Sequence, residues 1–151
     1  TTAGVTALTT SGIAALTTDQ VVALRTDQVG AMKTNQVAAL TTDGIAAMET
    51  RDVAALTTAG VAALSTNQVS KGLTTDQVAA LTTAGAAALT TASVSALTTD
   101  QVVALRTDQV AALKTDQVGA LSTDGIAARM RHGNDRRLLP DHPRACRRLI
   151  H

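Results

Sequence analysis

Residues Thr17–Met48 read TTDQVVAL, RTDQVGAM, KTNQVAAL and TTDGIAAM, which are four consecutive copies of one eight-residue unit, or octad. The same octad fills residues 1–128 in sixteen copies. The ninth copy, STNQVSKGL (Ser65–Leu73), is one residue longer, and we expect the extra residue to form a local bulge or loop. A fixed short period of this kind is typical of repeat architectures, in which each unit packs only on its neighbours.

The eight positions of the octad differ in how much they vary from copy to copy. Position two is threonine in every copy, position five is valine or isoleucine except at Ala86, and position seven is nearly always alanine. Position eight is leucine or methionine until Arg129 replaces it in the last copy. Positions one, three, four and six vary more. We therefore expect the restricted positions to face inward and the variable positions to present polar contacts.

The spacing of positions two, five and eight favours helix over strand. They are three residues apart, so they line one side of a short helix, whereas a strand alternates with a period of two. Eight residues rotate a helix by about 800°, which leaves a drift of roughly 80° per octad, so one straight helix would spread these side chains around its circumference. The sequence therefore predicts an all-α solenoid, a superhelical spiral of very short helices with one helix in each octad.

A single octad is too small to fold by itself. Burying one valine and one leucine contributes about 3–6 kcal/mol, whereas ordering eight residues costs about 12 kcal/mol. Stability must therefore come from the stacking of octads, and the small alanine at position seven permits close approach. A β-solenoid is the alternative, since valine and threonine favour strands, but the many alanine and aspartate residues disfavour it.

Threonine can begin each helix, because its hydroxyl accepts a hydrogen bond from a backbone N–H that has no partner within the helix. Two positions compete for this role. With position one as the N-cap, Thr17 and Gln20 would form a capping box. Arg25 and Lys33 occupy position one in other copies, however, and neither has a hydroxyl. We therefore predict that the N-caps are the position-two threonines Thr10, Thr18, Thr26, Thr34, Thr42, Thr50, Thr58, Thr66, Thr75, Thr83, Thr91, Thr99, Thr107, Thr115 and Thr123.

The composition argues against an enzyme and against a nucleic-acid-binding protein. The chain has 151 residues but no Phe, Tyr or Trp, although aromatic side chains usually supply much of a globular core. Residues 1–128 contain neither histidine nor cysteine, so a nucleophile there lacks the usual base, and we predict no catalytic residues. These residues carry a net charge of −4, which does not suit binding to phosphate backbones. The longest apolar stretches are about six residues, too short to span a bilayer.

Two ligand-binding alternatives rest on residues inside the octads. One ligand is a cation such as calcium, bound by aspartates that share position three and would stack in a row along a solenoid. The other is haem, for which the octads offer only Met32 and Met48 as axial ligands. We expect the aspartates to be solvated carboxylates at helix starts, and we predict neither a bound metal nor a cofactor. The aspartates are Asp19, Asp27, Asp43, Asp76, Asp100, Asp108, Asp116 and Asp124.

Residues 129–151 differ sharply from the octads, and we expect them to form a flexible basic tail. They carry a net charge of +5 and all the histidine, cysteine and proline of the chain. His132, His142, Cys146 and His151 are potential zinc donors, but their spacing fits no strong zinc pattern. An out-of-frame end would also explain the abrupt change in composition. The chain begins in mid-pattern without methionine, so we expect a fragment or a processed product.

The octads LTTDQVAAL (Leu73–Leu81) and LSTDGIAA (Leu121–Ala128) resemble the octapeptide arrays of very large bacterial surface or secreted proteins, which are described as adhesin-, haemagglutinin- or haem-utilisation-like. The resemblance covers residues 1–128 and implies an extended stalk or display region at the cell surface or outside the cell. We therefore predict a non-catalytic structural or interaction module whose partners are other proteins or further copies of itself. A ligand-binding module that captures calcium or haem is the alternative.

Overall fold

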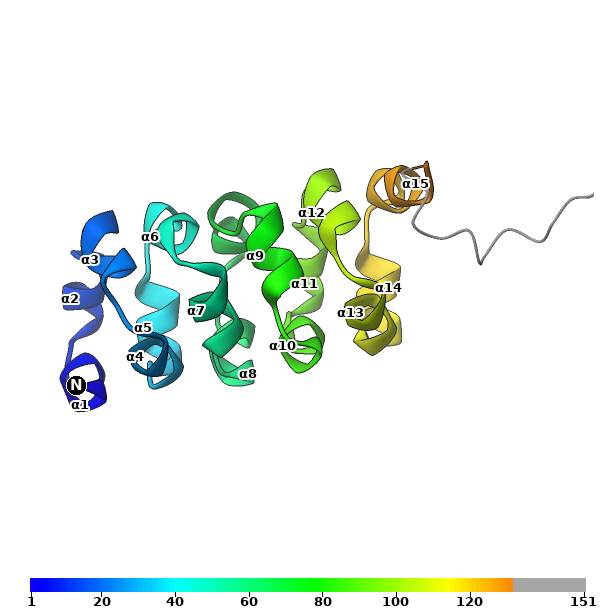
Figure 1. Ribbon diagram of the computed structural model, residues 1–151. Helices are drawn as coiled ribbons and strands as arrows, with labels where there is room; N and C mark the ends of the chain where they lie inside the picture. Colours follow the sequence, from blue (N-terminus) through cyan, green and yellow to red (C-terminus); the bar gives the residue numbers. More distant parts are fainter. Residues whose placement is uncertain (132–151) are drawn as a thin grey trace, which may run out of the picture.

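The computed structural model describes residues 1–131, which form sixteen short helices in one continuous stack (Figure 1). Each octad supplies one helix, and the described residues contain no strand. The predicted all-α solenoid is therefore confirmed, and the β-solenoid alternative is wrong. The helices are α1 (Thr2–Thr6), α2 (Thr10–Ala14), α3 (Thr18–Val22), α4 (Thr26–Gly30), α5 (Thr34–Ala39), α6 (Thr42–Ala47), α7 (Thr50–Ala55), α8 (Thr58–Ala62), η1 (Gln68–Gly72), α9 (Thr75–Ala80), α10 (Thr83–Ala88), α11 (Thr91–Ser95), α12 (Thr99–Ala104), α13 (Thr107–Ala112), α14 (Thr115–Ala120) and α15 (Thr123–Arg131).

The helices α1–α14 begin one residue earlier than the sequence suggests, because the N-cap of each α-helix in this series is the residue at position one. The backbone N–H of Gln20 donates to Thr17 Oγ1 at 3.3 Å, and the backbone N–H of Thr17 donates to Gln20 Oε1 at 3.0 Å. Where position one has no hydroxyl, the glutamine still supplies its half of this capping box. The backbone N–H groups of Arg25 and Lys33 each donate to a glutamine Oε1 at 2.9 Å. A side-chain oxygen at position one is therefore not essential.

The predicted N-caps at position two are consequently wrong. These threonines are the first helical residues, and most of them are exposed rather than facing inward. Apart from one hydrogen bond from Thr26 to Asp52, the described contacts do not explain why every octad has threonine there. The correction applies to Thr10, Thr18, Thr26, Thr34, Thr42, Thr50, Thr58, Thr66, Thr75, Thr83, Thr91, Thr99, Thr107, Thr115 and Thr123.

Two neighbouring threonines test this register directly. In the eighth octad the backbone N–H of Gly60 donates to Thr57 Oγ1 at 3.0 Å. Thr57→Val removes this cap, so we expect a loss of about 1 kcal/mol in the free energy of unfolding. Thr58→Val makes the same chemical change at an exposed helical position, and we expect a much smaller effect. Thermal and urea unfolding of both variants compare them; a larger loss from Thr58→Val would restore position two as the cap.

Two consecutive extended residues redirect the chain between successive helices of the central octads. Leu40 has φ −61° and ψ 139°, and Thr41 has φ −73° and ψ 158°. Met48 and Glu49 repeat this geometry after the next helix. These angles are those of polyproline II, which any residue adopts without strain. The chain therefore turns once per octad without glycine at the turn.

Helices pack in turns of three octads. The helix pairs with extensive contacts are always three octads apart, as in the series α1, α4, α7, α9, α12 and α15, when η1 is counted as the ninth octad. In Figure 1 this series climbs from lower left to upper right, so successive turns are rotated about the long axis of the stack. The object is therefore a superhelix in which each turn contacts the turn before it and the turn after it.

The extra residue of the ninth octad lies inside a helix. The backbone N–H of Leu73 donates to the carbonyl of Gln68 at 3.0 Å, a five-residue spacing that makes η1 a π-helix. A Cβ on Gly72 would lie only 3.3 Å from Ile45 Cβ, so the glycine permits close approach to the preceding turn. The predicted bulge is therefore absorbed by the helix, and the octads that follow keep their register.

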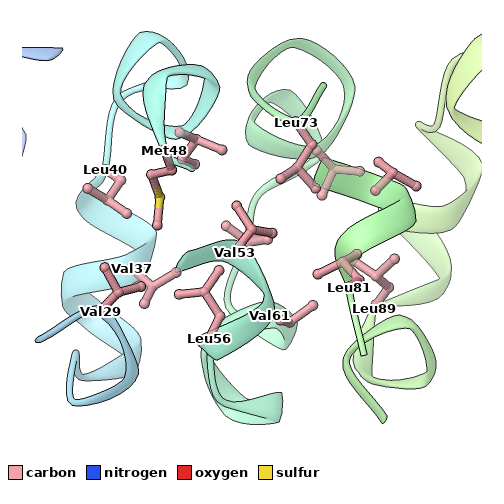
Figure 2. Packing of buried hydrophobic residues seen from close by; sticks show 14 of the residues in the cluster. Val29, Val37, Leu40, Met48, Val53, Leu56, Val61, Leu73, Leu81 and Leu89 are labelled. Atoms are coloured by element: carbon pink, nitrogen blue, oxygen red, sulfur yellow. The ribbon is translucent and has the colours of Figure 1, made fainter. Parts of the chain in front are cut away.

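One apolar core runs along the axis of the stack, as Figure 2 shows for its central part. Valine or isoleucine at position five and leucine or methionine at position eight supply it, for example Val37, Val53 and Leu81. Position four, which its variation between octads assigned to the surface, is buried as well from the fifth octad onward. Positions four, five and eight lie within about 100° of each other around a helix, whereas position two lies outside this arc.

Candidate functional site

The interface between turns is held by glutamines at position four. Gln77 Nε2 donates to the main-chain carbonyls of Ile45 at 2.8 Å and Met48 at 2.7 Å, at the end of a helix four octads earlier. Gln77 Oε1 accepts from the backbone N–H of Thr74 at 2.9 Å. The carbonyl of Ile45 also accepts from the backbone N–H of Met48 at 3.1 Å, so the amide adds a second hydrogen bond there and supplies one to the carbonyl of Met48. The glutamines that are buried and bridge turns in this way are Gln36, Gln68, Gln77, Gln101, Gln109 and Gln117.

Glycine at position four gives a second kind of contact. A Cβ on Gly44 would lie 3.5 Å from Val21 Cγ2, and one on Gly125 would lie 2.8 Å from Val102 Cβ. Glycine therefore lets the helix approach the valine of the preceding turn closely. The alternation of glutamine and glycine, which looks like surface variation in the sequence, selects between an amide bridge and close backbone packing. In the sequence, the feature that could have shown the importance of position four is its glutamine, which is placed to complete a capping box.

Arg129 replaces a bridging glutamine at the last turn. It stands at position eight of the sixteenth octad, and its Nη1 donates to the carbonyls of Val102 and Val103, each at 3.3 Å, and to that of Leu105. These carbonyls belong to the thirteenth octad. Inside the stack, a bridging glutamine contacts the carbonyls of the octad four before its own, so the guanidinium takes the place that a glutamine of a seventeenth octad would have. Helix α15 continues to Arg131, past the predicted end of the repeat segment at Ala128.

The role of Arg129 can be tested by a substitution that keeps its bulk. Arg129→Met places at position eight a residue that occurs there in other octads, but it removes the donors to three carbonyls. We expect a loss of about 1–3 kcal/mol in the free energy of unfolding and faster amide exchange in α12 and α15. Hydrogen exchange measured by mass spectrometry locates the effect. Unchanged exchange in both helices would show that the guanidinium does not hold the last turn.

The two ends of the stack expose opposite halves of the interface between turns. Position eight packs toward the preceding turn, and it is incompletely buried in the first three octads, where Leu8 is 39% exposed. Position five packs toward the following turn, and it is incompletely buried in the last three octads, where Val118 is 42% exposed. In the middle octads both positions are buried.

Three exposed ion pairs lie on the outer surface of residues 1–131, and one of them joins Arg51 and Glu49 at 2.6 Å. The other two are arginine–aspartate pairs. Arg25 contacts Asp27 at 2.8 Å, and Arg106 contacts Asp108 at 2.9 Å. The hydrogen bond from the arginine lowers the pKa of each aspartate, and the arginine charge adds to this effect. The pairs therefore favour the folded state above the ordinary carboxyl pKa, and this contribution is lost as pH falls through the lowered value. Solvent screens both pairs, so they shape the surface charge more than the stability.

The residues considered as ligands do not form a common site within residues 1–131. With three octads per turn, the position-three aspartates divide among three rows; Asp76, Asp100 and Asp124 are the longest run on consecutive turns, and Asp19 and Asp43 are a further pair. In this part of the chain no three acidic, histidine or cysteine side chains are grouped to hold a metal ion. Met32 and Met48 are buried in the core. The zinc donors considered in the tail lie outside the described residues.

Stacked octads with contacts between adjacent turns define an α-helical solenoid of the repeat-protein class. The model of the ALTTAQ repeat family matches residues 1–26, 15–42, 45–83 and 87–115, which together make up more than half of the chain. The chain therefore belongs to the ALTTAQ repeat family. No curated protein and no solved structure matches it significantly. Within residues 1–131, no helix is long and apolar enough to cross a membrane.

Proposed function

We propose that this solenoid is a non-catalytic spacer and display module of a bacterial surface-associated or secreted protein. The observation that supports the proposal is the restriction of extensive helix contacts to adjacent turns. Because each turn packs only on its neighbours, adding octads lengthens the stack without changing its interior. The resemblance to the octapeptide arrays of large surface and secreted proteins supports the location.

The outer face suits display, because it is polar and varies from octad to octad. Position one carries side chains as different as Thr41, Lys33 and Glu49, and all three are exposed. Position three carries exposed aspartate in eight octads and asparagine, alanine, serine or arginine elsewhere. The buried amides fix the scaffold, so the outer positions can change without loss of the fold. Such a surface presents protein-binding groups along a defined length.

Deletion of one whole turn tests the spacer role. Residues 74–97 comprise three octads, which make one turn. When they are deleted, the octad of Gln101 directly follows the ninth octad, so Gln101 takes the position in the stack that Gln77 has in the full chain. We expect the variant to keep its helical circular dichroism and to shorten by about 8–10 Å, the usual distance between packed helices. Small-angle X-ray scattering measures the length. Loss of folding, or an unchanged length, would contradict a spacer built from independent turns.

Location and ligand binding need separate measurements. Antibodies against the octads are expected to label intact cells that produce the protein, and labelling only after lysis would overturn the surface location. Calorimetry with calcium chloride and with haemin tests the alternative of a ligand-binding module. We expect no stoichiometric binding of either ligand; binding of calcium that is lost in Asp76→Ala and Asp100→Ala would replace display by cation capture.

A further inference from the structure

The seventh octad, ETRDVAAL (Glu49–Leu56), starts its helix differently from the other octads. Glu49 stands at position one, where its side chain has no hydroxyl and contacts Arg51 at 2.6 Å. Asp52 stands at position four, where it makes no hydrogen bond to the backbone N–H of Glu49. Helix α7 therefore begins without either half of a capping box. Each other helix within residues 1–131 has at least one side-chain hydrogen bond to the backbone at its start.

The same octad also lacks the contacts that position four makes between turns elsewhere. From the fifth octad onward, the other residues at position four are bridging glutamines, closely packed glycines and Ser93, whose Oγ donates to the carbonyl of Leu64 at 3.3 Å. A carboxylate has no N–H to donate. Within residues 1–131, the carbonyls of Val21 and Leu24, which a glutamine in place of Asp52 would contact, accept no side-chain hydrogen bond.

Asp52 is also the one ionisable side chain that is buried within the described residues. It is 1% exposed, and its described side-chain hydrogen bond comes from Thr26 Oγ1 at 2.7 Å. A buried carboxylate loses its hydration, and one hydroxyl donor offsets only part of that cost. The residue at position four therefore destabilises the seventh octad, whereas it stabilises the octads in which it is a bridging glutamine.

The apolar residues of the seventh octad are buried like those of its neighbours. Val53 is 1% exposed and Leu56 is 7% exposed, and both lie in the core shown in Figure 2. In Figure 1, α7 lies in the middle of the stack, and it packs on α4 of the preceding turn and on α9 of the following turn. The octad is thus held by ordinary apolar packing but by fewer polar contacts, and this difference comes from its own residues Glu49 and Asp52.

We propose that the seventh octad opens locally at a lower free energy than the octads around it, so that the stack has a built-in weak point at α7. In a solenoid, stability is approximately the sum of the terms of each octad and of its contacts with neighbours, so missing terms in one octad act there first. In the proposed spacer, α7 is where the module lengthens first under tension. This consequence rests on the proposed function, whereas the local opening does not.

Hydrogen exchange of the full chain, measured by mass spectrometry, tests the local opening. Amide protection factors report the free energy at which each helix opens. We expect the protection factors in α7 to be about 5–30-fold lower than those in α6, α8 and α9, since one cap and one bridge between turns are missing. A gradual change of stability along the stack cannot produce a minimum at α7, because α6 and α8 lie on either side of it in the chain.

Two substitutions restore the missing contacts separately. Asp52→Gln supplies an amide whose oxygen can accept from the backbone N–H of Glu49. The amide nitrogen can donate to the carbonyls of Val21 and Leu24, and we expect protection in α7 to rise by about 5–30-fold. Glu49→Thr supplies the hydroxyl cap of the neighbouring octads and should raise protection about fivefold. Asp43→Gln is the matched control, because it makes the same chemical change at an exposed position three of the sixth octad and should leave α7 unchanged.

Protection in α7 that equals or exceeds that in both α6 and α8 would overturn the proposal, and so would unchanged protection in α7 after Asp52→Gln. Glu49→Thr changes only an exposed residue, so it decides the question if Asp52→Gln loses its helical circular dichroism. An equal gain in α7 from Asp43→Gln would also contradict the proposal, because the lost negative charge, and not the restored contacts, would then be the cause. The one-turn deletion leaves α7 in place, so the spacer role and the local opening fail separately.

Discussion

Gln101→Glu is expected to lower the free energy of unfolding by about 3–5 kcal/mol, the range found when a buried charge has no partner. Gln101 is 2% exposed, and its Nε2 donates to the carbonyls of Val69 at 2.7 Å and Leu73 at 2.6 Å. The substitution keeps the shape of the side chain but turns the donor into a charged acceptor facing two carbonyl oxygens. Urea unfolding followed by circular dichroism measures the loss.

Gln20→Glu is the matched control for this prediction. It makes the same chemical change at the same octad position, but Gln20 is exposed and bridges no turns within the described residues. We expect a change within about 0.5 kcal/mol, as for other surface substitutions. Similar losses in the two variants would show that the cost comes from the capping box rather than from the bridge between turns.

The effect of Gln101→Glu should also depend on pH. Burial against carbonyl oxygens would raise the pKa of the new carboxyl group in the folded protein above its unfolded value. The charge penalty is then absent below the unfolded pKa and appears as pH rises through the folded pKa. Unfolding at pH 4 and at pH 8 is expected to show a smaller loss at pH 4. A loss independent of pH would mean that shape, not charge, is the cause.

Leu81→Ala is expected to destabilise the fold by about 2–5 kcal/mol, the range for a leucine removed from a close-packed core. Leu81 is 1% exposed and lies in the core between turns shown in Figure 2. The cavity cannot collapse easily, because the turns on both sides are fixed by buried amides. Thermal unfolding monitored by circular dichroism should give a lower midpoint and a transition that stays cooperative.

Leu8→Ala provides the comparison, since Leu8 holds the same octad position at the end of the stack and is 39% exposed. Less contact is lost there, so we expect a clearly smaller effect on the free energy of unfolding. An equal effect at the two positions would contradict the conclusion that position eight packs toward the preceding turn. Two identical substitutions in one chain thus separate the effect of burial from the local effect of replacing leucine by alanine.

The period, the number of octads and the preference for helix over strand follow from the order of residues within the octads alone. The predicted start of each helix is wrong because it assumes that every N-cap residue needs a side-chain hydroxyl. Glutamine three residues later supplies half of the capping box, so Arg25 and Lys33 can occupy the cap. The sequence also contains the correct alternative, because Thr17 and Gln20 have the spacing of a capping box with position one as the N-cap.

By contrast, contacts between turns establish that three octads make a turn and that position four faces inward. The partners of Gln77 are Ile45 and Met48, 32 and 29 residues earlier, and no local pattern indicates them. Local preferences act over one helix turn and its caps, and they are set by the residues of one octad. The angle at which octads follow one another, and hence which side chains meet, depends on packing between turns.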